Sequence, residues 1–293
     1  MEKYRIVKNT VQETLILPLY GRWLCTQRFP ELFQDSTAAE LMEKVDYDFS
    51  ALKRQANGLM QTFGTLEVAM RQSDLAWEVR DYLKARPKAA VVNLGCGLDN
   101  TGRACDNGRC RIYNVDLPNV IEMRNRQLPA GDREQNLALN LKDPDWLEAI
   151  DAEPADGTIL LAAGVFCYFK TEEVKALTIR MAQRFPGGRL VFGAAGKTAV
   201  RLMLKTWIKQ AGIKNVGAYF SVRDAKREME PWSPLLSVSS RGYMLGYQPL
   251  NDPAIRPVHR LLAKIADGPM RLQIVRIDFT ENCCCQIGGK HAD

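Results

Sequence analysis

The stretch Val91–Asn100, VVNLGCGLDN, decides the fold of this chain. It contains a short apolar run rich in valine, then a Gly-x-Gly turn, then the start of a helix. Strands buried on both faces have this composition, and open parallel sheets bind ligands beyond the carboxyl ends of their strands. Glycine at such an end lets the backbone approach a ligand where a Cβ would clash. The stretch therefore predicts a parallel sheet with a ligand site at the turn.

Apolar runs like this one recur along the rest of the chain, separated by stretches with helical spacing. Strands are predicted at 89–94, 112–115, 135–139, 158–163, 189–193, 235–239 and 272–279. Helices are predicted between them at 118–128, 144–150, 171–185, 198–211 and 255–266. Strands that alternate with helices are typical of a doubly wound sheet. We predict an α/β, Rossmann-like fold with a seven-stranded, mostly parallel sheet.

The first 85 residues have a different pattern, in which apolar residues recur at helical spacing and no strand run is found. Pro18 and Pro30 are expected to break the first part into short helices. Asp74 is expected to cap a helix that carries Trp77. The chain is thus predicted to comprise an N-terminal helical cap at 1–85, a Rossmann-like core at 86–282 and a flexible tail at 283–293.

Composition excludes several classes of protein. Of the 293 residues, 46% are hydrophobic and 25% charged, which is ordinary for a globular chain. No run approaches the roughly 20 apolar residues of a membrane span, and the N-terminus lacks a signal-peptide core, so a cytoplasmic protein is expected. The net charge of +6 is scattered, which argues against nucleic acid as a partner. Eight cysteines are expected to be free thiols, and the adjacent Cys283–Cys285 cannot easily bind one metal ion.

The turn and the next strand together favour a nucleoside ligand that carries no phosphate. The Gly95-Cys96-Gly97 turn lacks the third glycine that a dinucleotide's pyrophosphate requires. Asp116 ends the strand IYNVD and can accept the hydroxyl protons of a ribose. S-adenosylmethionine, which yields S-adenosylhomocysteine as product, fits this description. A nicotinamide-dependent oxidoreductase is the alternative on the same fold, but the hydride-relay pattern it needs is missing.

Several motifs in one order resemble the leucine carboxyl methyltransferase family, and above all its bacterial branch associated with polyketide O-methylation. They are LPLYGRWLCTQRFPELFQDSTAAEL, AMRQSD, VVNLGCGLDN, YNVDLPNVIEMRNRQL, AAGVFCYFKTEEV and RFPGGRLVFGAAG, which together span roughly residues 15–240. The resemblance implies a class I methyltransferase fold, S-adenosylmethionine as the cofactor and O-methylation as the activity.

The resemblance also implies roles for individual residues. Arg71 matches an arginine that holds the methionyl carboxylate, a task that suits a guanidinium. The other implied cofactor contacts are Gly95, Cys96 and Gly97 with the methionine moiety, Asp116 with the ribose, Leu117, Asn140 and Leu141 with the adenine, and Ala163 and Gly164 after the next strand. Ala163 stands where the carboxyl methyltransferases proper have Glu, which leaves the acceptor open. LDNTGR departs from the family's LDTR, which leaves Arg103 without a role.

The acceptor is expected to be a small molecule, anionic or aromatic, that is methylated by in-line displacement. A carboxylate needs no general base, whereas a hydroxyl does. The candidate catalytic residues are Tyr168 and Arg22. The candidate substrate-binding residues are Tyr20, Arg22, Trp23 and Tyr168. Further residues that could line the substrate pocket are Phe220, Tyr243 and Tyr247. The alternative is that Tyr20 and Trp23 belong to the core and that Arg22 forms a buried structural pair. His259 is expected to be structural.

Two further functions stay open at this point. The chain could bind S-adenosylmethionine as a regulatory protein without catalysis, given Ala163 and Asn140 in place of acids. It could also methylate a protein C-terminus, although no peptide-binding insertion is evident.

Overall fold

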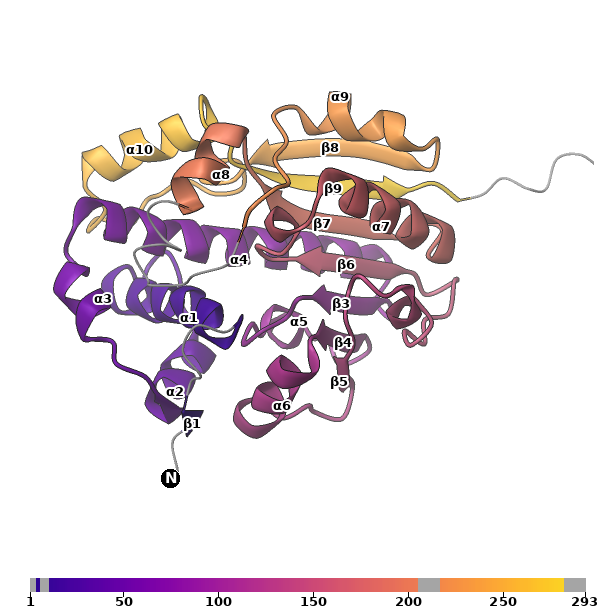
Figure 1. Ribbon diagram of the computed structural model, residues 1–293, viewed down its shortest axis with the longest axis horizontal. Helices are drawn as coiled ribbons and strands as arrows, with labels where there is room; N and C mark the ends of the chain where they lie inside the picture. Colours follow the sequence, from indigo (N-terminus) through magenta and orange to yellow (C-terminus); the bar gives the residue numbers. More distant parts are fainter. Residues whose placement is uncertain (1–3, 6–10, 205–216, 282–293) are drawn as a thin grey trace, which may run out of the picture.

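The computed structural model describes residues 4–5, 11–204 and 217–281, which contain one seven-stranded sheet (Figure 1). Its strands are β3 (Ala90–Leu94), β4 (Arg111–Asp116), β5 (Glu134–Ala138), β6 (Thr158–Ala162), β7 (Arg189–Ala194), β8 (Leu236–Gly242) and β9 (Gln273–Phe279). The order is β5-β4-β3-β6-β7-β9-β8, and only β9 is antiparallel to its neighbours β7 and β8. The predicted α/β fold with a mostly parallel sheet is confirmed, and β8 alone extends clearly beyond its predicted end at residue 239.

The strand order reverses at β3. The chain moves from β3 to β4 and β5 on one side, and then returns to place β6 and β7 on the other. In doubly wound sheets the crevice for a ligand opens at this reversal, beyond the carboxyl ends of the strands. The turn that follows Leu94 therefore lies where a ligand site is expected.

Helices cover both faces of the sheet, because neighbouring strand residues point to opposite sides. Val92 belongs to a core cluster with α7 (Thr171–Arg184), the 3-10 turn η1 (Pro144–Leu147) and α9 (Ala225–Met229). Val91 belongs to a second cluster on the other face, with α4 (Leu59–Ala85) and α10 (Pro257–Asp267). The short α5 (Thr101–Ala104) packs on β3 and β4, and α6 (Pro118–Gln127) on β4 and β5. The remaining elements of the core are η2 (Phe166–Tyr168), α8 (Lys197–Met203) and η4 (Glu230–Trp232).

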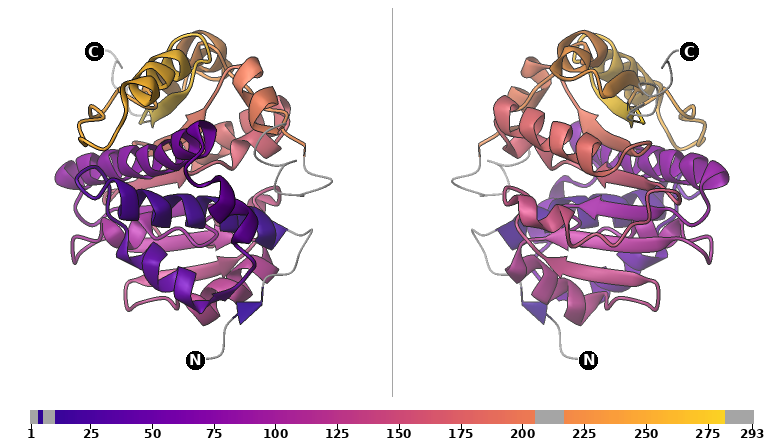
Figure 2. Two further views of the ribbon diagram at one scale, coloured as in Figure 1. Left: turned by 90° about the vertical axis from the view of Figure 1, so that its left-hand side faces the viewer. Right: turned by 90° about the vertical axis from the view of Figure 1, so that its right-hand side faces the viewer.

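The N-terminal helices pack against the turn after β3. They are α1 (Val11–Arg28), α2 (Ser36–Lys44) and α3 (Ser50–Gln55), accompanied by the two-residue pair β1 (Tyr4–Arg5) and β2 (Val45–Asp46). Figure 2 shows them in front of the sheet in its left view. Their core cluster includes Leu98 from the turn and Met123 from α6. The cap thus shares a hydrophobic core with the Rossmann-like part, and the domain boundary at residue 85 stays a prediction.

Three local predictions in the helices are wrong. Pro18 does not break a helix but lies inside α1, where burial of Ile16 and Leu19 against the cap core outweighs the lost backbone hydrogen bond. Asp74 caps nothing, because it lies in the middle of the 27-residue α4. Residues 144–147 form a 3-10 turn rather than an α-helix. The predicted helix 198–211 begins as α8, and its later part lies outside the described residues, as do the predicted tail 283–293 and the three adjacent cysteines.

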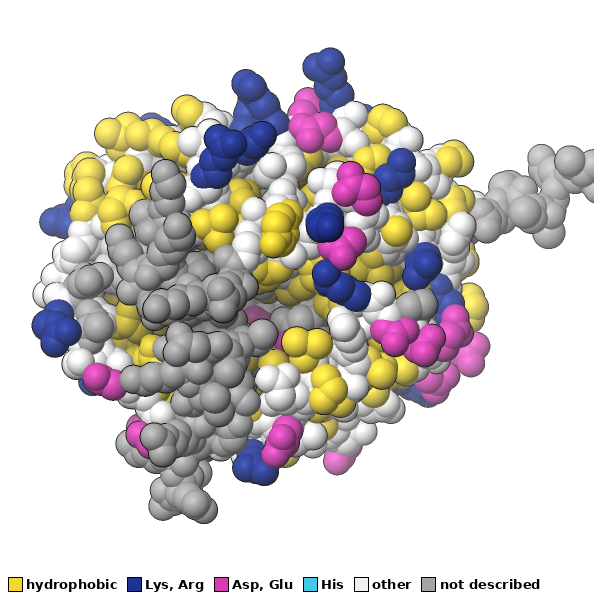
Figure 3. All heavy atoms as spheres, viewed as in Figure 1, with side chains coloured by type: hydrophobic (Ala, Val, Ile, Leu, Met, Phe, Trp, Pro, Cys, Tyr) yellow, Lys and Arg dark blue, Asp and Glu magenta, His cyan; other side chains and the backbone are white. Residues whose placement is uncertain are grey.

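The surface carries both signs of charge. On the face in Figure 3, basic and acidic side chains are interspersed with exposed apolar ones. None of the described helices combines the length and the apolar character that a membrane crossing requires. The five cysteines in the described part of the chain are free thiols, and the same residues contain no cluster of three His, Cys, Asp or Glu that could hold a metal.

Candidate functional site

The Gly-x-Gly turn has a backbone that only glycine accommodates well. Gly95 and Gly97 have φ values of 61° and 47°, in the left-handed region. A Cβ on Gly95 would lie 2.5 Å from Val165 Cγ2, and one on Gly97 would lie 2.7 Å from Leu15 Cδ2. The turn is therefore closed in by the loop after β6 on one side and by α1 on the other.

Asp116 is held beside this turn by two backbone groups. Gly97 N donates to its Oδ2 at 2.8 Å, and Leu117 N donates to its Oδ1 at 2.7 Å. Burial raises the pKa of Asp116, while these two hydrogen bonds and the charge of Arg124 act to lower it. Each carboxylate oxygen has two lone pairs, so the side chain can still accept the hydroxyl protons of a ribose.

Arg71 crosses the carboxyl ends of β6 and β7 from its position in α4. A Cβ on Gly164 would lie 2.8 Å from Arg71 Nη1, and one on Gly193 would lie 3.3 Å from Arg71 Cδ. Burial acts to lower the pKa of Arg71, but Tyr243, Glu67 and other neighbours raise it above its usual range. The guanidinium is therefore charged, half-buried and available to bind an anionic group.

The thiol and the two phenols around Arg71 are protonated at neutral pH. Burial raises the pKa of the Cys167 thiol to about 11 and raises the pKa of the phenols of Tyr168 and Tyr243. Glu67 lies one helical turn before Arg71 on α4, and burial raises its pKa while Arg71 acts to lower it. Glu67 adds a carboxyl group to these neighbours of Arg71.

The residues expected at the adenine lie at the ends of β4 and β5. Leu139 N donates to Asp116 O at 2.9 Å, which brings the two strand ends together. Asn140 follows with an exposed side chain, whose Oδ1 accepts from Lys142 N at 3.1 Å, and Leu141 is buried. The structure therefore brings these residues to the same edge as Asp116 and Leu117.

Cys96 and Ala163 line the same edge. Cys96 is buried in the turn, and burial raises the pKa of its thiol to about 12. Ala163 is half-buried directly after β6, and Gly164 beside it has a φ of 75°. Neither residue supplies an ionised group at neutral pH.

The aromatic candidates of the cap lie elsewhere. Tyr20 is only 1% exposed and stacks on Phe49 with ring centroids 5.6 Å apart, so it is a core residue. Trp23 is half-buried and lines a pocket of about 600 Å³ between α1, α2, β2 and α3, together with Tyr47 and Phe49. Of the two, Trp23 remains a candidate for contact with a ligand.

Arg22 forms the buried structural pair that was its alternative interpretation. Its Nη1 donates to Asp35 Oδ2 at 2.9 Å, and its Nη2 donates to Leu98 O at 3.0 Å. The residue is 3% exposed. A guanidinium enclosed in this way is not free to bind an acceptor. Its partners therefore favour the structural role of Arg22 over the catalytic one.

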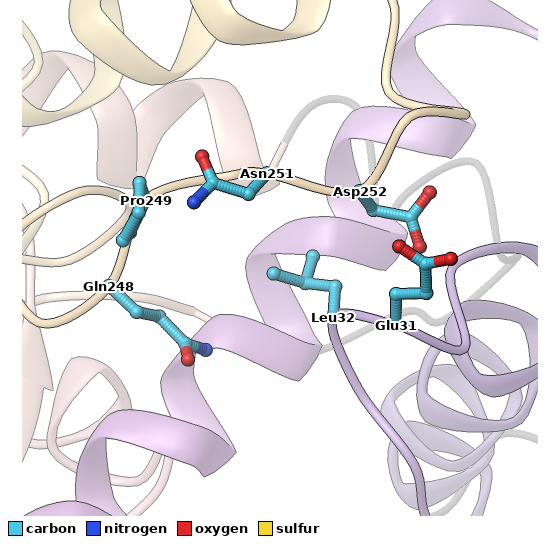
Figure 4. Close-up of a pocket in the computed structure, with 6 residues that line it drawn as sticks. All are labelled: Glu31, Leu32, Gln248, Pro249, Asn251 and Asp252. Carbon is cyan, nitrogen blue, oxygen red and sulfur yellow. The ribbon is translucent and has the colours of Figure 1, made fainter.

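Other side chains considered from the sequence are buried or have structural partners. His259 is buried in α10, and burial lowers its pKa. Tyr247 donates to Glu78 at 2.7 Å, and Phe220 packs between Phe192 and Trp232. A smaller pocket of about 220 Å³ lies between the α1–α2 loop and residues 248–252, with Glu31 and Asp252 among its lining (Figure 4). Neither this pocket nor the larger one beside Trp23 is lined by a residue of the turn or of the ends of β3, β4 and β6.

Sequence reasoning missed Arg124, which is fully buried beneath the turn. Its Nη1 donates to Gly97 O at 2.9 Å and to Asp99 O at 2.7 Å. A signal was present, because Arg124 occupies the apolar face of α6 together with Val120 and Ile121. An arginine at such a position has to find buried acceptors. Arg103, left without a role, binds Glu134 in the same network.

Residues 17–182 match the family model described as leucine carboxyl methyltransferase. The chain belongs to this family. The resemblance noted in the sequence is thereby confirmed. TcmP, the tetracenomycin polyketide synthesis O-methyltransferase of Streptomyces glaucescens, is 28% identical over 271 residues, which is 86% of this chain and 95% of that protein.

Solved structures agree on the fold. A protein of Thermobifida fusca YX described as a methyltransferase has a TM-score of 0.58 at 14% identity, over 84% of this chain and 93% of its own. A DUF574 family protein of Streptomyces avermitilis has a TM-score of 0.57 at 10% identity, over 81% and 92%. These likenesses confirm the Rossmann-like class I methyltransferase fold.

Membership of the family makes the chain an S-adenosylmethionine-dependent methyltransferase, and S-adenosylmethionine is its cofactor. The alternative of a nicotinamide-dependent oxidoreductase is wrong. The residues present fit the cofactor, since the Asp116 carboxylate at the turn can accept from hydroxyls and the Arg71 guanidinium beside Gly164 can bind a carboxylate.

Proposed function

We propose that this family member transfers a methyl group to a carboxylate oxygen of a small aromatic acceptor. The observation that carries the proposal is the cluster around Arg71, where the thiol and both phenols hold their protons at neutral pH. A carboxylic acid with an ordinary pKa near 4 is already ionised at that pH and needs no base. The relative TcmP is an O-methyltransferase of polyketide synthesis, which supports a small-molecule acceptor.

The proposed cofactor contacts follow the geometry of the turn. Asp116 would accept hydrogen bonds from the ribose, and Arg71 would bind the methionyl carboxylate. Leu117, Asn140 and Leu141 would surround the adenine, with Gly95, Cys96, Gly97, Ala163 and Gly164 next to the methionine moiety. When bound, the cofactor supplies an activated methyl group on a sulfonium, so the task of the protein is to orient the acceptor oxygen and exclude water.

The cap would orient the acceptor. Trp23 lines a pocket whose volume of about 600 Å³ lies in the range of small-molecule sites. Tyr168 would contribute a neutral hydroxyl that donates a hydrogen bond to the acceptor. Replacement of Trp23 by Ala is expected to raise the KM for the acceptor and to leave the affinity for S-adenosylhomocysteine unchanged.

The test is methyl transfer from radiolabelled S-adenosylmethionine to matched pairs of aromatic carboxylic acids and phenols. We expect methyl ester products, with a rate that does not change between pH 6 and pH 9. Methylation of phenols alone would contradict the carboxylate proposal. Product on protein C-termini but on no small acid would likewise contradict a small-molecule acceptor.

A hydroxyl acceptor would require a base, and the carboxyl group of Glu67, one helical turn from Arg71, is the candidate for that role. Replacing Glu67 by Gln separates the two acceptor classes. For a carboxylate acceptor the variant should keep its kcat, whereas for a hydroxyl acceptor kcat should fall by about 10²–10⁴-fold.

A further inference from the structure

Three successive carbonyl oxygens of the turn each accept a hydrogen bond from a buried guanidinium. Arg124 Nη1 donates to Gly97 O at 2.9 Å and to Asp99 O at 2.7 Å. Arg22 Nη2 donates to Leu98 O, between them, at 3.0 Å. The two arginines come from different parts of the fold, Arg124 from α6 in the core and Arg22 from α1 in the cap.

Arg22 is itself fixed by an acidic partner of the cap. Its Nη1 donates to Asp35 Oδ2 at 2.9 Å, and both side chains are 4% exposed. The other oxygen of Asp35 accepts from Ala38 N at 2.9 Å, which caps α2. The position of Leu98 O is thus tied through one guanidinium to the docking of α1 and α2.

Arg124 is fixed by a polar network beneath the turn. Its Nε donates to Asn136 Oδ1 at 3.1 Å, and its Nη2 donates to Glu134 Oε1 at 3.3 Å. Asn114 Nδ2 donates to the same Glu134 oxygen at 2.6 Å, and Arg103 Nε donates to Glu134 Oε2 at 2.8 Å. Arg124 is 0% exposed, so its guanidinium has one arrangement open to it.

We propose that Arg22 and Arg124 are positioning residues that hold the turn in its cofactor-binding conformation before the cofactor arrives. In this arrangement Arg22 also makes the affinity for the cofactor depend on the docking of the cap. The inference rests on cofactor binding at the turn and does not depend on which acceptor is methylated.

The geometry of Gly97 explains why hydrogen bonds from Arg22 and Arg124 to the turn would raise the affinity for the cofactor. Its N–H donates to Asp116 and its carbonyl accepts from Arg124, so the residue is held at both ends. Without these bonds a glycine has more backbone freedom to lose on binding than any other residue. A turn that is ordered in advance spares the ligand this entropic cost, and affinity rises accordingly.

The experiment compares Arg22→Met and Arg124→Met with Arg189→Met as the matched control. Arg189 is 7% exposed and forms a buried ion pair with Glu78 at 3.2 Å, but it lies at the amino end of β7, away from the turn. All three variants lose a buried guanidinium and should lose thermal stability. Only the first two should weaken S-adenosylhomocysteine binding, by tenfold or more in calorimetry at a temperature where every variant is folded.

The readout separates positioning from general stability. We expect Arg189→Met to bind S-adenosylhomocysteine within twofold of the unmodified protein. The variants Arg22→Lys and Arg124→Lys, which keep the charge and a donor, should recover part of the lost affinity. The proposal is overturned if Arg22→Met and Arg124→Met bind within twofold of the unmodified protein, or if Arg189→Met loses as much affinity as they do.

A measurement on the unmodified protein keeps the proposal testable if the methionine variants do not fold. Hydrogen exchange without ligand should show the Gly97 amide already protected, because its N–H donates to Asp116 and its carbonyl accepts from Arg124. Exchange at the rate of an unstructured peptide until S-adenosylhomocysteine is added would contradict a preformed turn. This result is independent of whether any acceptor is methylated.

Discussion

Asp116 shows how one side chain serves both the turn and the ligand. Its two oxygens already accept from Gly97 N and Leu117 N, and the proposed ribose contacts add to these bonds. We expect Asp116→Ala to weaken S-adenosylhomocysteine binding by about 1–3 kcal/mol, the scale of charge-assisted hydrogen bonds. Titration calorimetry measures the change. Asp151→Ala, which removes an exposed partner of Arg111, is the control and should bind normally. An unchanged affinity in Asp116→Ala would remove this residue from the site.

The role proposed for Arg71 can be tested separately. Its side chain reaches Gly164 and Gly193 at the ends of β6 and β7. We expect Arg71→Ala to raise the KM for S-adenosylmethionine more than the KM for the acceptor. Arg80→Ala is the control, since Arg80 lies on the same helix with an exposed side chain. A larger effect on the acceptor KM would place Arg71 on the acceptor side.

At the scale of elements, the contact between α1 and the turn can be tested with two glycines. Gly97 and Gly108 both have positive φ, but a Cβ on Gly97 would lie 2.7 Å from Leu15, whereas one on Gly108 would meet nothing within 4 Å. Both alanine variants carry backbone strain of about 1 kcal/mol or more. We expect only Gly97→Ala to weaken S-adenosylhomocysteine binding, as measured by calorimetry. Equal affinities in the two variants would show that α1 does not constrain the turn.

The sequence predicted the sheet well because its central strands, such as β3 and β6, are apolar runs that are buried on both faces, whereas the more polar β5 and β8 lie at its edges. Elements whose form depends on distant contacts were predicted poorly. Pro18 continues a helix because the cap core surrounds it, and Asp74 lies within α4 because that helix packs along the sheet. Arg124 went unnoticed because α6 also carries Glu122 and Arg126, so its charged residues were taken as exposed, although the place of Arg124 beside Val120 and Ile121 on the apolar face was a signal.

The candidate site likewise has one part that the sequence predicts and one part that depends on distant contacts. Gly95, Gly97 and Asp116 are close in sequence, so motif spacing was enough to find them. The cluster around Arg71 joins α4, the loop after β6 and the segment after β8, and its members Glu67 and Cys167 have no local signature. Their association becomes visible only when the chain is folded, which is why the acceptor side was the less predictable one.

At the scale of the whole molecule, stability should depend on pH through Asp74. This side chain is 2% exposed, and burial, then Asp267 and Glu78, raises its pKa from 3.8 to about 8. The folded protein therefore holds a proton that the unfolded chain has already lost between about pH 4 and pH 8. The stabilisation is complete below pH 4 and is lost as the pH rises through 8.

Asp74→Asn removes this titration and keeps the shape of the side chain. We expect its Tm, relative to the unmodified protein, to increase steadily from pH 5 to pH 8, as followed by thermal unfolding. Asp132→Asn, which changes an exposed aspartate, should show a difference that does not vary with pH. A constant difference for Asp74→Asn would mean that the carboxyl is not protonated in the fold.

The insertion of β9 between β7 and β8 has a consequence for synthesis on the ribosome. Within the sheet β8 bonds only to β9, which ends 37 residues after β8 ends, at Phe279 rather than Gly242. At a translation rate of about 5–20 residues per second, the nascent chain would wait roughly 2–7 s with β8 unpaired and the edge of β7 open. Exposed strand edges are sites of aggregation. We expect a chain stopped before Gln273 to be cleaved rapidly by protease within residues 189–242, and equal resistance to that of the complete sheet would contradict this order of assembly.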